Sequence, residues 1–239
     1  RMPADTKLYL YTDPGGLIDR AASTFEPDQL AGWVPHQQIT YLWPSGPWFW
    51  VFDALAVPDW IAHRLWIGSI MFAAGAGARH CARHLGHGGA AALAAAAVYQ
   101  LSPYLLPYIS RTSLLLLPWA GLGWIVAATI RATRSDVQAT RLDRWRDPAV
   151  IALIVATVGS TNATALAMIV PAPAIWIALG VWQRRLALRR VLAVAARVAA
   201  VCVSVSLWWV AMLLVQSRWG APVLLYSETL EDASRNSTR

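Results

Sequence analysis

The sequence predicts an all-α fold, a polytopic bundle of transmembrane helices with an outer-face loop and short interfacial helices. Two observations predict this class. First, 57% of the 239 residues are hydrophobic and only 14% are charged, whereas soluble domains have about 25% charged residues. Second, the arginines behind the net charge of +7 occur in short clusters between long uncharged runs. Nucleic-acid-binding proteins gather such charge on one polar face, so we expect a lipid bilayer as partner and no nucleic acid.

The first part of the chain, residues 1–60, is predicted to be a loop outside the membrane that ends in an interfacial helix. Residues 48–57 lie between two prolines and are too few to cross a bilayer, which takes about 20 apolar residues. They include Trp48 and Trp50, and tryptophan is enriched where protein meets lipid headgroups. The abrupt polar start and the abrupt end of the chain predict a fragment of a longer polypeptide, with at least one membrane helix before this segment.

Residues 61–216 are predicted to hold the membrane helices, because arginine clusters separate long, nearly uncharged runs there, with Arg64 and Arg197 near the ends of two of them. Four runs have about the length of a single span, namely residues 61–77, 88–107, 113–130 and 191–215. After the last of them, residues 217–239 are predicted to begin a further segment outside the membrane.

One more uncharged run, residues 148–183, is long for a single crossing and short for two. Arginines flank both of its ends, so both ends are predicted to lie on the same side of the membrane. The run must then turn, either at residues 159–162 or at residues 171–173. Either turn leaves one short limb and a cavity near the outer face, because irregular backbone at that depth needs protein or water around it.

The distribution of charge predicts the orientation. Eleven arginines, all those from Arg79 to Arg190 except Arg111, fall in three clusters on one face, which the positive-inside rule assigns to the cytoplasm. Ten of the thirteen carboxylates then fall on the opposite, periplasmic face. Because acidic residues contribute little to orientation, we expect this asymmetry to serve binding or catalysis. The prediction is a multi-pass plasma-membrane protein with a periplasmic active site.

Acids on the outer face are the candidate catalytic groups. Asp5 lies closest to the predicted missing helix, and Glu228 follows the last predicted span by about a dozen residues. Either carboxylate could act as a general base toward a hydroxyl, and the alternative for both is a structural loop or cap acid. Lys7, beside Asp5, is a candidate for stabilising departing negative charge.

Cations, rings and amides on the same face predict substrate binding. Arg111 lies alone in a tight turn between two uncharged runs, and its planar fork suits a phosphate; anchoring to lipid headgroups is the alternative. Arg64, near the outer end of the run 61–77, is a second and weaker candidate for this role, with a place at the membrane interface as the alternative. Trp43 carries a ring that could stack on a sugar. Hydrogen-bonding groups for sugar hydroxyls are offered by His36, Gln37 and Gln38.

Motifs for cofactors are missing from the sequence. It contains no Walker A loop, dinucleotide fingerprint or HExxH helix. The two cysteines are far apart and lack metal-ligand spacing. We therefore predict no cofactor, and the segment does not indicate a divalent metal.

Several motifs resemble those of one family. They are Asp5-Thr6-Lys7, Asp13-Pro14, Gln37-Gln38, Tyr41-Leu42-Trp43-Pro44-Ser45-Gly46-Pro47-Trp48-Phe49, Ser102-Pro103-Tyr104 through Arg111-Thr112-Ser113, Leu117-Pro118-Trp119-Ala120-Gly121, and Gly159-Ser160-Thr161-Asn162-Ala163. Together they resemble the AftD-type α-(1→3)-arabinofuranosyltransferases of mycobacterial cell walls. One motif differs: where that family usually has a sequence similar to Gln-Asn-Gln, this chain has His36-Gln37-Gln38. Asp13 and Asn162, which lie in these motifs, join the substrate-binding candidates.

The resemblance implies a GT-C membrane glycosyltransferase. Its lipid donor would be decaprenyl-phosphoryl-arabinose, and its acceptor the arabinan of lipoarabinomannan and arabinogalactan. It also implies a catalytic acid in the first outer loop, where Asp5 lies. The alternatives are a polytopic transporter or a lipid or polysaccharide flippase, and a scaffolding membrane subunit without activity. Transporters place ionisable groups near the bilayer midplane, whereas the predicted spans are nearly uncharged.

Overall fold

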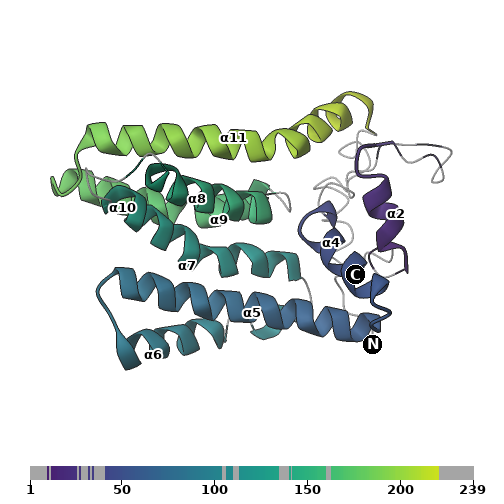
Figure 1. The fold of residues 1–239 in the computed structure, drawn as a ribbon, viewed down its shortest axis with the longest axis horizontal. Helices are drawn as coiled ribbons and strands as arrows, with labels where there is room; N and C mark the ends of the chain where they lie inside the picture. The colour runs from purple at the N-terminus through teal and green to yellow at the C-terminus, as the bar shows by residue number, and fades with distance from the viewer. Residues whose placement is uncertain are drawn as a thin grey trace, which may run out of the picture.

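The computed structural model describes residues 10, 12–25, 27, 32, 34, 41–103, 106–109, 113–134, 140, 142–159 and 163–220, and every regular element in these ranges is a helix (Figure 1). The predicted all-α class is confirmed. The elements are α2 (Pro14–Asp19), α4 (Ser45–Ala54), α5 (Asp59–His84), α6 (Gly89–Gln100), the 3-10 turn η1 (Leu106–Tyr108), α7 (Ser113–Arg134), α8 (Asp143–Gly159), α9 (Ala163–Ile169), α10 (Pro171–Trp182) and α11 (Leu188–Trp219).

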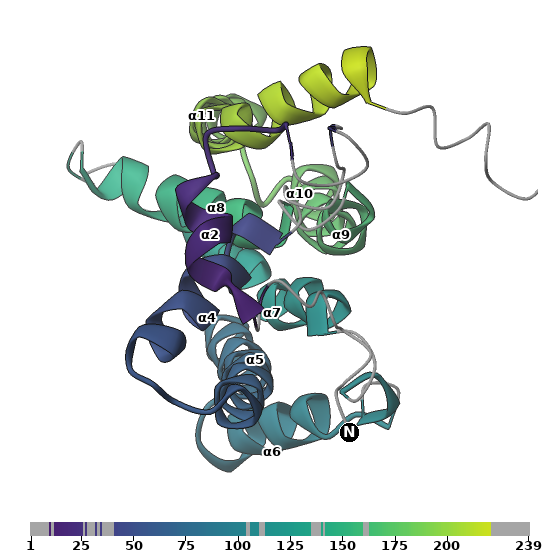
Figure 2. The same ribbon diagram turned by 90° about the vertical axis from the view of Figure 1, so that its right-hand side faces the viewer.

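Helix α7 is the centre of the bundle, because it packs against α5, α8, α9 and α10. Figure 2 shows the resulting stack, with α6 and α5 on one side of α7 and with α8, α10 and α11 on the other. Helices α2 and α4 lie together at one end of the bundle (Figure 1). We call this end the loop end, and the opposite end, where the ends of α5 and α7 carry Arg83 and Arg134, the basic end.

Three helices in the described part of the chain are long and apolar enough to cross a membrane, at Leu116–Arg134, Thr164–Trp182 and Leu188–Trp219. Two of them contain the predicted spans 113–130 and 191–215 almost entirely. The predicted span 61–77 lies within α5, which has 26 residues but is not one of the three. Arginine marks the ends of α5 and α7, as expected where a helix leaves the apolar core.

The predicted span 88–107 is wrong as one continuous helix. Helix α6 has 12 residues and ends at Gln100, which gives it a length of about 18 Å against a bilayer core of about 30 Å. The chain includes Pro103 just beyond this end, and a proline disfavours helical geometry in the residue before it. The amides of Leu101 and Ser102 close the last turn by donating to the carbonyls of Ala97 and Tyr99.

The run 148–183 turns at the first of the two predicted places. Helix α8 ends at Gly159 and α9 begins at Ala163, and the two helices pack against each other. The alternative turn at 171–173 is wrong, because α10 follows α9 with only a bend at Val170, which itself has helical backbone angles, and the amide of Ala174 donates to the Val170 carbonyl at 3.1 Å. Pro171 is accommodated because a first-turn proline loses no hydrogen bond.

The helix predicted to lie at the interface is present but begins earlier than predicted, and its position at the interface stays a prediction. Helix α4 runs from Ser45 to Ala54 instead of over residues 48–57, because Pro47 falls in the first turn, where its missing N–H costs nothing. The buried Ser45 hydroxyl donates to the Tyr41 carbonyl at 3.1 Å. The Trp48 indole donates to the Ala62 carbonyl of α5 at 3.1 Å, which fixes α4 against the bundle.

Glycine allows α5 and α7 to cross in backbone contact. A Cβ on Gly123 would overlap the backbone of Gly77, so the crossing requires glycine there, as is common between membrane helices. Next to it, the Trp124 ring covers Gly77, and its indole N–H donates to the Ala73 carbonyl at 2.8 Å. The crossing fixes α5 relative to α7 at this height.

Candidate functional site

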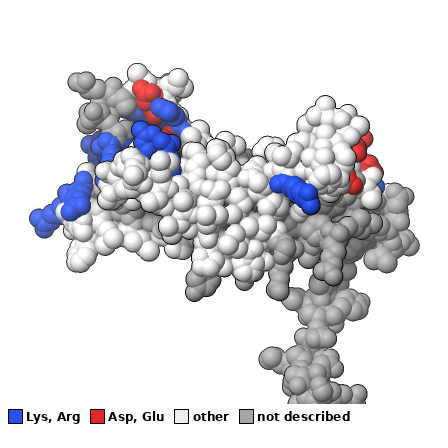
Figure 3. All heavy atoms as spheres, turned by 90° about the horizontal axis from the view of Figure 1, so that it is seen from below, with Lys and Arg blue, Asp and Glu red and all other residues white. Residues whose placement is uncertain are grey.

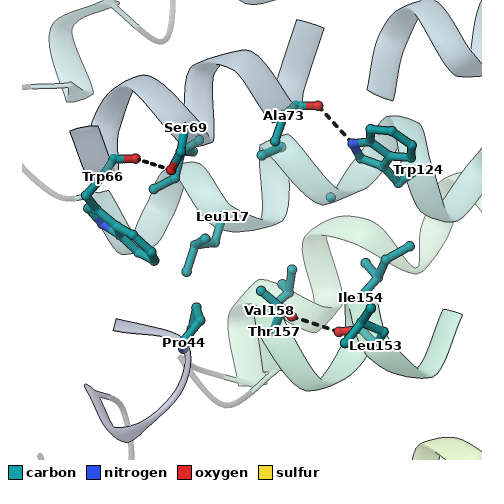
Figure 4. Close-up of a pocket in the computed structure, with 13 residues that line it drawn as sticks. Pro44, Trp66, Ser69, Ala73, Leu117, Trp124, Leu153, Ile154, Thr157 and Val158 are labelled. Carbon is teal, nitrogen blue, oxygen red and sulfur yellow. Dashed lines mark hydrogen bonds between the residues drawn. The ribbon is translucent and has the colours of Figure 1, made fainter. Parts of the chain in front are cut away.

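An apolar groove of about 310 Å³ lies between α5, α7 and α8 (Figure 4). Each helix contributes residues at three- and four-residue spacing, the period of one helix face. The lining residues are Trp66, Ser69, Ile70 and Ala73 of α5, Leu117, Ala120, Gly121 and Trp124 of α7, Leu153, Ile154, Thr157 and Val158 of α8, and Pro44. Because α7 packs against both neighbours, its face is the floor of the groove.

The polar groups in the groove are occupied by the protein itself. The Ser69 hydroxyl donates to the Trp66 carbonyl at 2.7 Å, and the Thr157 hydroxyl donates to the Leu153 carbonyl at 2.8 Å. The Trp124 indole is bonded to Ala73. A ligand would therefore meet a hydrocarbon surface with no lining charge, which suits an apolar chain and penalises a buried ion.

Small residues give the groove its depth. A Cβ on Gly121 would lie 3.1 Å from Val158 and 3.2 Å from Ile154, so a larger side chain there would project toward the α8 wall. Pro44, from the segment that precedes α4, lies across the groove from Trp66 and Leu117 (Figure 4). The groove thus reaches the loop end, where Pro44 borders it.

Of the sequence-predicted site residues, three lie in described parts of the chain. Asp13 caps α2, because its carboxylate accepts from the Gly16 amide at 2.8 Å. Trp43 directly precedes Pro44 and is 39% exposed. Arg64 is exposed on the loop-end half of α5, with its guanidinium 4.8 Å from the Trp60 ring centre. Their roles in substrate binding stay predictions.

The other site predictions fall outside the described residues. These are the candidate catalytic residues Asp5 and Glu228 and the candidate binding residues Lys7, His36, Gln37, Gln38, Arg111 and Asn162. Whether Asp5, Arg111 and Glu228 meet in one pocket is therefore a prediction that the structure leaves untested. No group of three metal-ligating side chains occurs within the part of the chain that the structure describes.

Sequence reasoning predicted a cavity beside residues 148–183 but not its walls. The groove does border α8 within that run, whereas its other two walls come from α5 and α7. A signal for the floor was present, since Leu117, Ala120, Gly121 and Trp124 follow the spacing of a single helix face. The helices that face this floor could not be deduced from it.

By its fold and its groove, the chain belongs to the class of helical membrane proteins that have an apolar groove between their helices. Cryo-EM structures of the arabinofuranosyltransferase AftD from mycobacteria are similar to it, one with a TM-score of 0.77 and one of a mutant with a TM-score of 0.75, both at 28% identity. The similarity covers 90% of this chain and 16% and 17% of the respective solved chains. The fold is accordingly that of a GT-C membrane protein.

A family model described as "Alpha-(1->3)-arabinofuranosyltransferase, N-terminal GT-C domain" matches residues 1–238, and the chain belongs to this family. An alpha-(1->3)-arabinofuranosyltransferase of Mycolicibacterium smegmatis is 31% identical over 233 residues, 94% of the chain. One of Mycobacterium tuberculosis is 33% identical over 178 residues, 72% of the chain. The chain spans 15% and 12% of the lengths of these relatives. The family resemblance noted in the sequence is confirmed.

Proposed function

We propose that the chain is part of a membrane glycosyltransferase that moves arabinofuranose from decaprenyl-phosphoryl-arabinose to cell-wall arabinan, that of lipoarabinomannan or arabinogalactan. The observation that carries the proposal is the apolar groove, which runs between three helices to the loop end of a chain of this family. A polyprenyl chain is the part of such a donor that requires a hydrocarbon surface. With the chain in the groove, the phosphate and sugar emerge beside Pro44 and Trp43.

Charge at the loop end supports this orientation of the donor. Arg64, stacked on Trp60, presents a guanidinium fork suited to phosphate. Figure 3 shows most of the basic residues in this view gathered at the basic end, together with acids, whereas the opposite end shows acids and a smaller basic patch. By the positive-inside rule, the protein then crosses the plasma membrane several times, and its loop end faces the periplasm.

The chemistry proposed at the loop end is a displacement at the anomeric carbon. Asp5 or Glu228 takes the proton of an acceptor hydroxyl, a role worth typically about 10² to 10⁴ in rate. The hydroxyl oxygen bonds to the anomeric carbon from the face opposite the phosphate, and the bond from that carbon to the phosphate oxygen breaks. Polyprenyl phosphate leaves, with Arg111 and Lys7 stabilising its charge.

The polytopic transporter or flippase is the competing function. Transporters place ionisable groups near the bilayer midplane, whereas every residue that lines this groove is uncharged. The groove therefore supports binding of a lipid chain better than coupling to an ion. Transfer measurements separate the two functions directly.

Substituting Gly121 in the full-length enzyme tests the groove. We expect Gly121→Leu to fill it and to lower transfer from decaprenyl-phosphoryl-arabinose at least tenfold, while transfer from a donor with a short prenyl chain is retained. Retained turnover with the short donor shows that the variant folds. Gly68→Leu is the matched control, because Gly68 is on α5 with no atom within 4 Å of an added Cβ. Normal use of the long donor by Gly121→Leu would overturn the proposal.

A further inference from the structure

A charged cluster joins the same three helices at the basic end. Arg131 of α7 donates from Nε and Nη2 to Oδ1 of Asp147 in α8, each at 2.8 Å. Its remaining nitrogen, Nη1, contacts Nε2 of His80 in α5. The Arg131 guanidinium on α7 therefore connects to both α5 and α8 through side-chain contacts.

The cluster is partly withdrawn from solvent and adjoins the groove. Asp147 is 8% exposed, and the Arg131 side chain is 24% exposed. The His80 ring lies 5.2 Å from the Trp124 ring, and Trp124 lines the groove. His80 is thus in contact with both the cluster and the groove wall.

A hydrogen bond from Arg131 to the His80 ring requires a neutral imidazole. A guanidinium has five N–H donors and no acceptor, and it stays protonated in proteins. The Nε2 atom of His80 must then accept with its lone pair, so the ring is neutral with its proton on Nδ1. Protonating Nε2 would remove the acceptor and place a second positive charge beside Arg131.

Other charged groups around His80 act in the same direction, with one exception. Arg83 and His84 lie on its own helix, Arg131 and Arg134 on α7, and Asp147 on α8. Residues 80–84 lie beyond the predicted span, which ends at residue 77. Burial, followed by the charges of His84, Arg131 and Arg83, holds the pKa of His80 below its ordinary value of 6.5, and Asp147 opposes this. Helix α10 adds a neutral ring, Trp176, over Arg134.

The sign of the resulting pH dependence follows from this lowered pKa. His80 binds a proton less readily in the folded chain than in the unfolded chain. Its contribution to stability is therefore complete above pH 6.5 and is lost as the pH falls from there through the lower pKa of the folded state. The closed cluster is the state expected at neutral pH.

We propose that His80, Arg131 and Asp147 form an acid-sensitive latch that sets the position of α5 against α7 and α8, and with it the width of the groove. The latch is closed while His80 is neutral and opens when His80 takes up a proton. The effect of the latch on catalysis rests on the proposed function, in which the donor chain binds in the groove. The movement of the helices is independent of that proposal.

His84 provides a matched control for His80. It is one helical turn away on α5, and burial and nearby arginines hold its pKa below the ordinary value as well. Arg134, however, donates to the backbone carbonyl of His84 at 2.9 Å instead of to its ring. Replacing the His84 ring therefore leaves this interhelical bond in place.

Spin-label distances between α5 and α8 test the latch in the full-length protein. The labels are placed on cysteines introduced at the exposed positions Arg79 and Ala149, with other cysteines replaced and no donor present. Between pH 8 and pH 5 we expect the distance to lengthen by on the order of 2 Å, the size of helix shifts in switching proteins.

Two variants decide the outcome. His80→Gln supplies an amide oxygen that accepts from Arg131 without titrating, so its distance stays that of the closed state at both pH values. His84→Gln keeps the shift, at a somewhat higher pH than in the wild type, because His84 no longer lowers the pKa of His80. An unchanged distance in the wild type, or a shift that persists in His80→Gln, would overturn the latch.

Donor kinetics test the connection to the groove. We expect the KM for the long-chain donor to rise at pH 5 in the wild type, relative to that of His80→Gln at the same pH. Equal KM values for the wild type and His80→Gln at pH 5 would show that the latch does not affect donor binding. A complete lack of transfer by the wild type at any pH would instead contradict the proposed function and leave the distance measurement valid.

Discussion

The two ends of the bundle use charge in opposite ways. At the basic end, Arg131 is bonded to Asp147 and contacts His80, so charged side chains connect three helices. At the loop end, Asp13 and Arg64 are exposed: Asp13 caps a short helix, and Arg64 lies over the exposed ring of Trp60. The contrast indicates that charge at the basic end holds helices together, whereas charge at the loop end faces the surroundings of the protein.

Removing Asp147 is the strongest test of this contrast. In Asp147→Ala, Arg131 stays beside His80 without its carboxylate. Breaking a buried ion pair costs about 3–5 kcal/mol, and partial exposure of Arg131 reduces our expectation to about 2–3 kcal/mol. Chemical denaturation in detergent measures this loss.

The control for Asp147 lies on the same helix. Asp143 is exposed and bonded locally to Thr140 at 2.6 Å, so Asp143→Ala is expected to cost less. Adding Arg131→Met to Asp147→Ala should restore part of the stability, because no unpaired charge then remains. Equal losses for both aspartates would remove the distinction between paired and surface charge.

A smaller effect is expected from the neutral contact that holds the loop end. Trp48→Phe removes the indole N–H that donates to Ala62 but keeps a ring against Trp66, 5.4 Å away. We expect the free energy of unfolding to fall by about 1 kcal/mol. The control Trp50→Phe changes a half-exposed ring on the same helix and should stay within about 0.5 kcal/mol. A larger loss from Trp50→Phe would show that α4 is held by a different face.

Arg64 should show the smallest effect on stability, together with a change in kinetics. Arg64→Gln is expected to alter the free energy of unfolding by less than about 0.5 kcal/mol. If the guanidinium meets the donor phosphate, the KM for the donor rises about two- to fivefold, as expected for one exposed charge contact. Arg64→Lys should recover only part, because an ammonium lacks the planar fork. An unchanged KM in Arg64→Gln would exclude Arg64 from donor binding.

Composition and charge clusters were enough to predict the class and most helix positions. The span 113–130 was found because arginine follows it directly, and the real helix ends at Arg134. The run 88–107 was wrongly predicted as one span because its residues are hydrophobic throughout, and hydrophobicity does not show where a helix ends. The helix ends near Pro103, which affects only the backbone next to it. The cap at Asp13 had a signal, since Asp followed by Pro is typical of a helix start.

The groove could not be predicted in the same way. Its three walls come from segments separated by dozens of residues, and its width depends on how closely α5 and α7 approach. That approach is decided by Gly77 and Gly123, two glycines among many in the chain. A single sequence does not indicate which pair meets.

The meeting of these two glycines has a mechanical consequence. Gly77 lies between His80 and the groove residues of α5, so the point of backbone contact with Gly123 acts as a fulcrum. We expect this contact to hold while the helices move, so that α5 tilts about this point. Spreading the helices at the basic end would press them together along the groove. Protonation of His80 at the basic end would then narrow the groove on the other side of the Gly77–Gly123 contact and compress a hydrocarbon chain bound there.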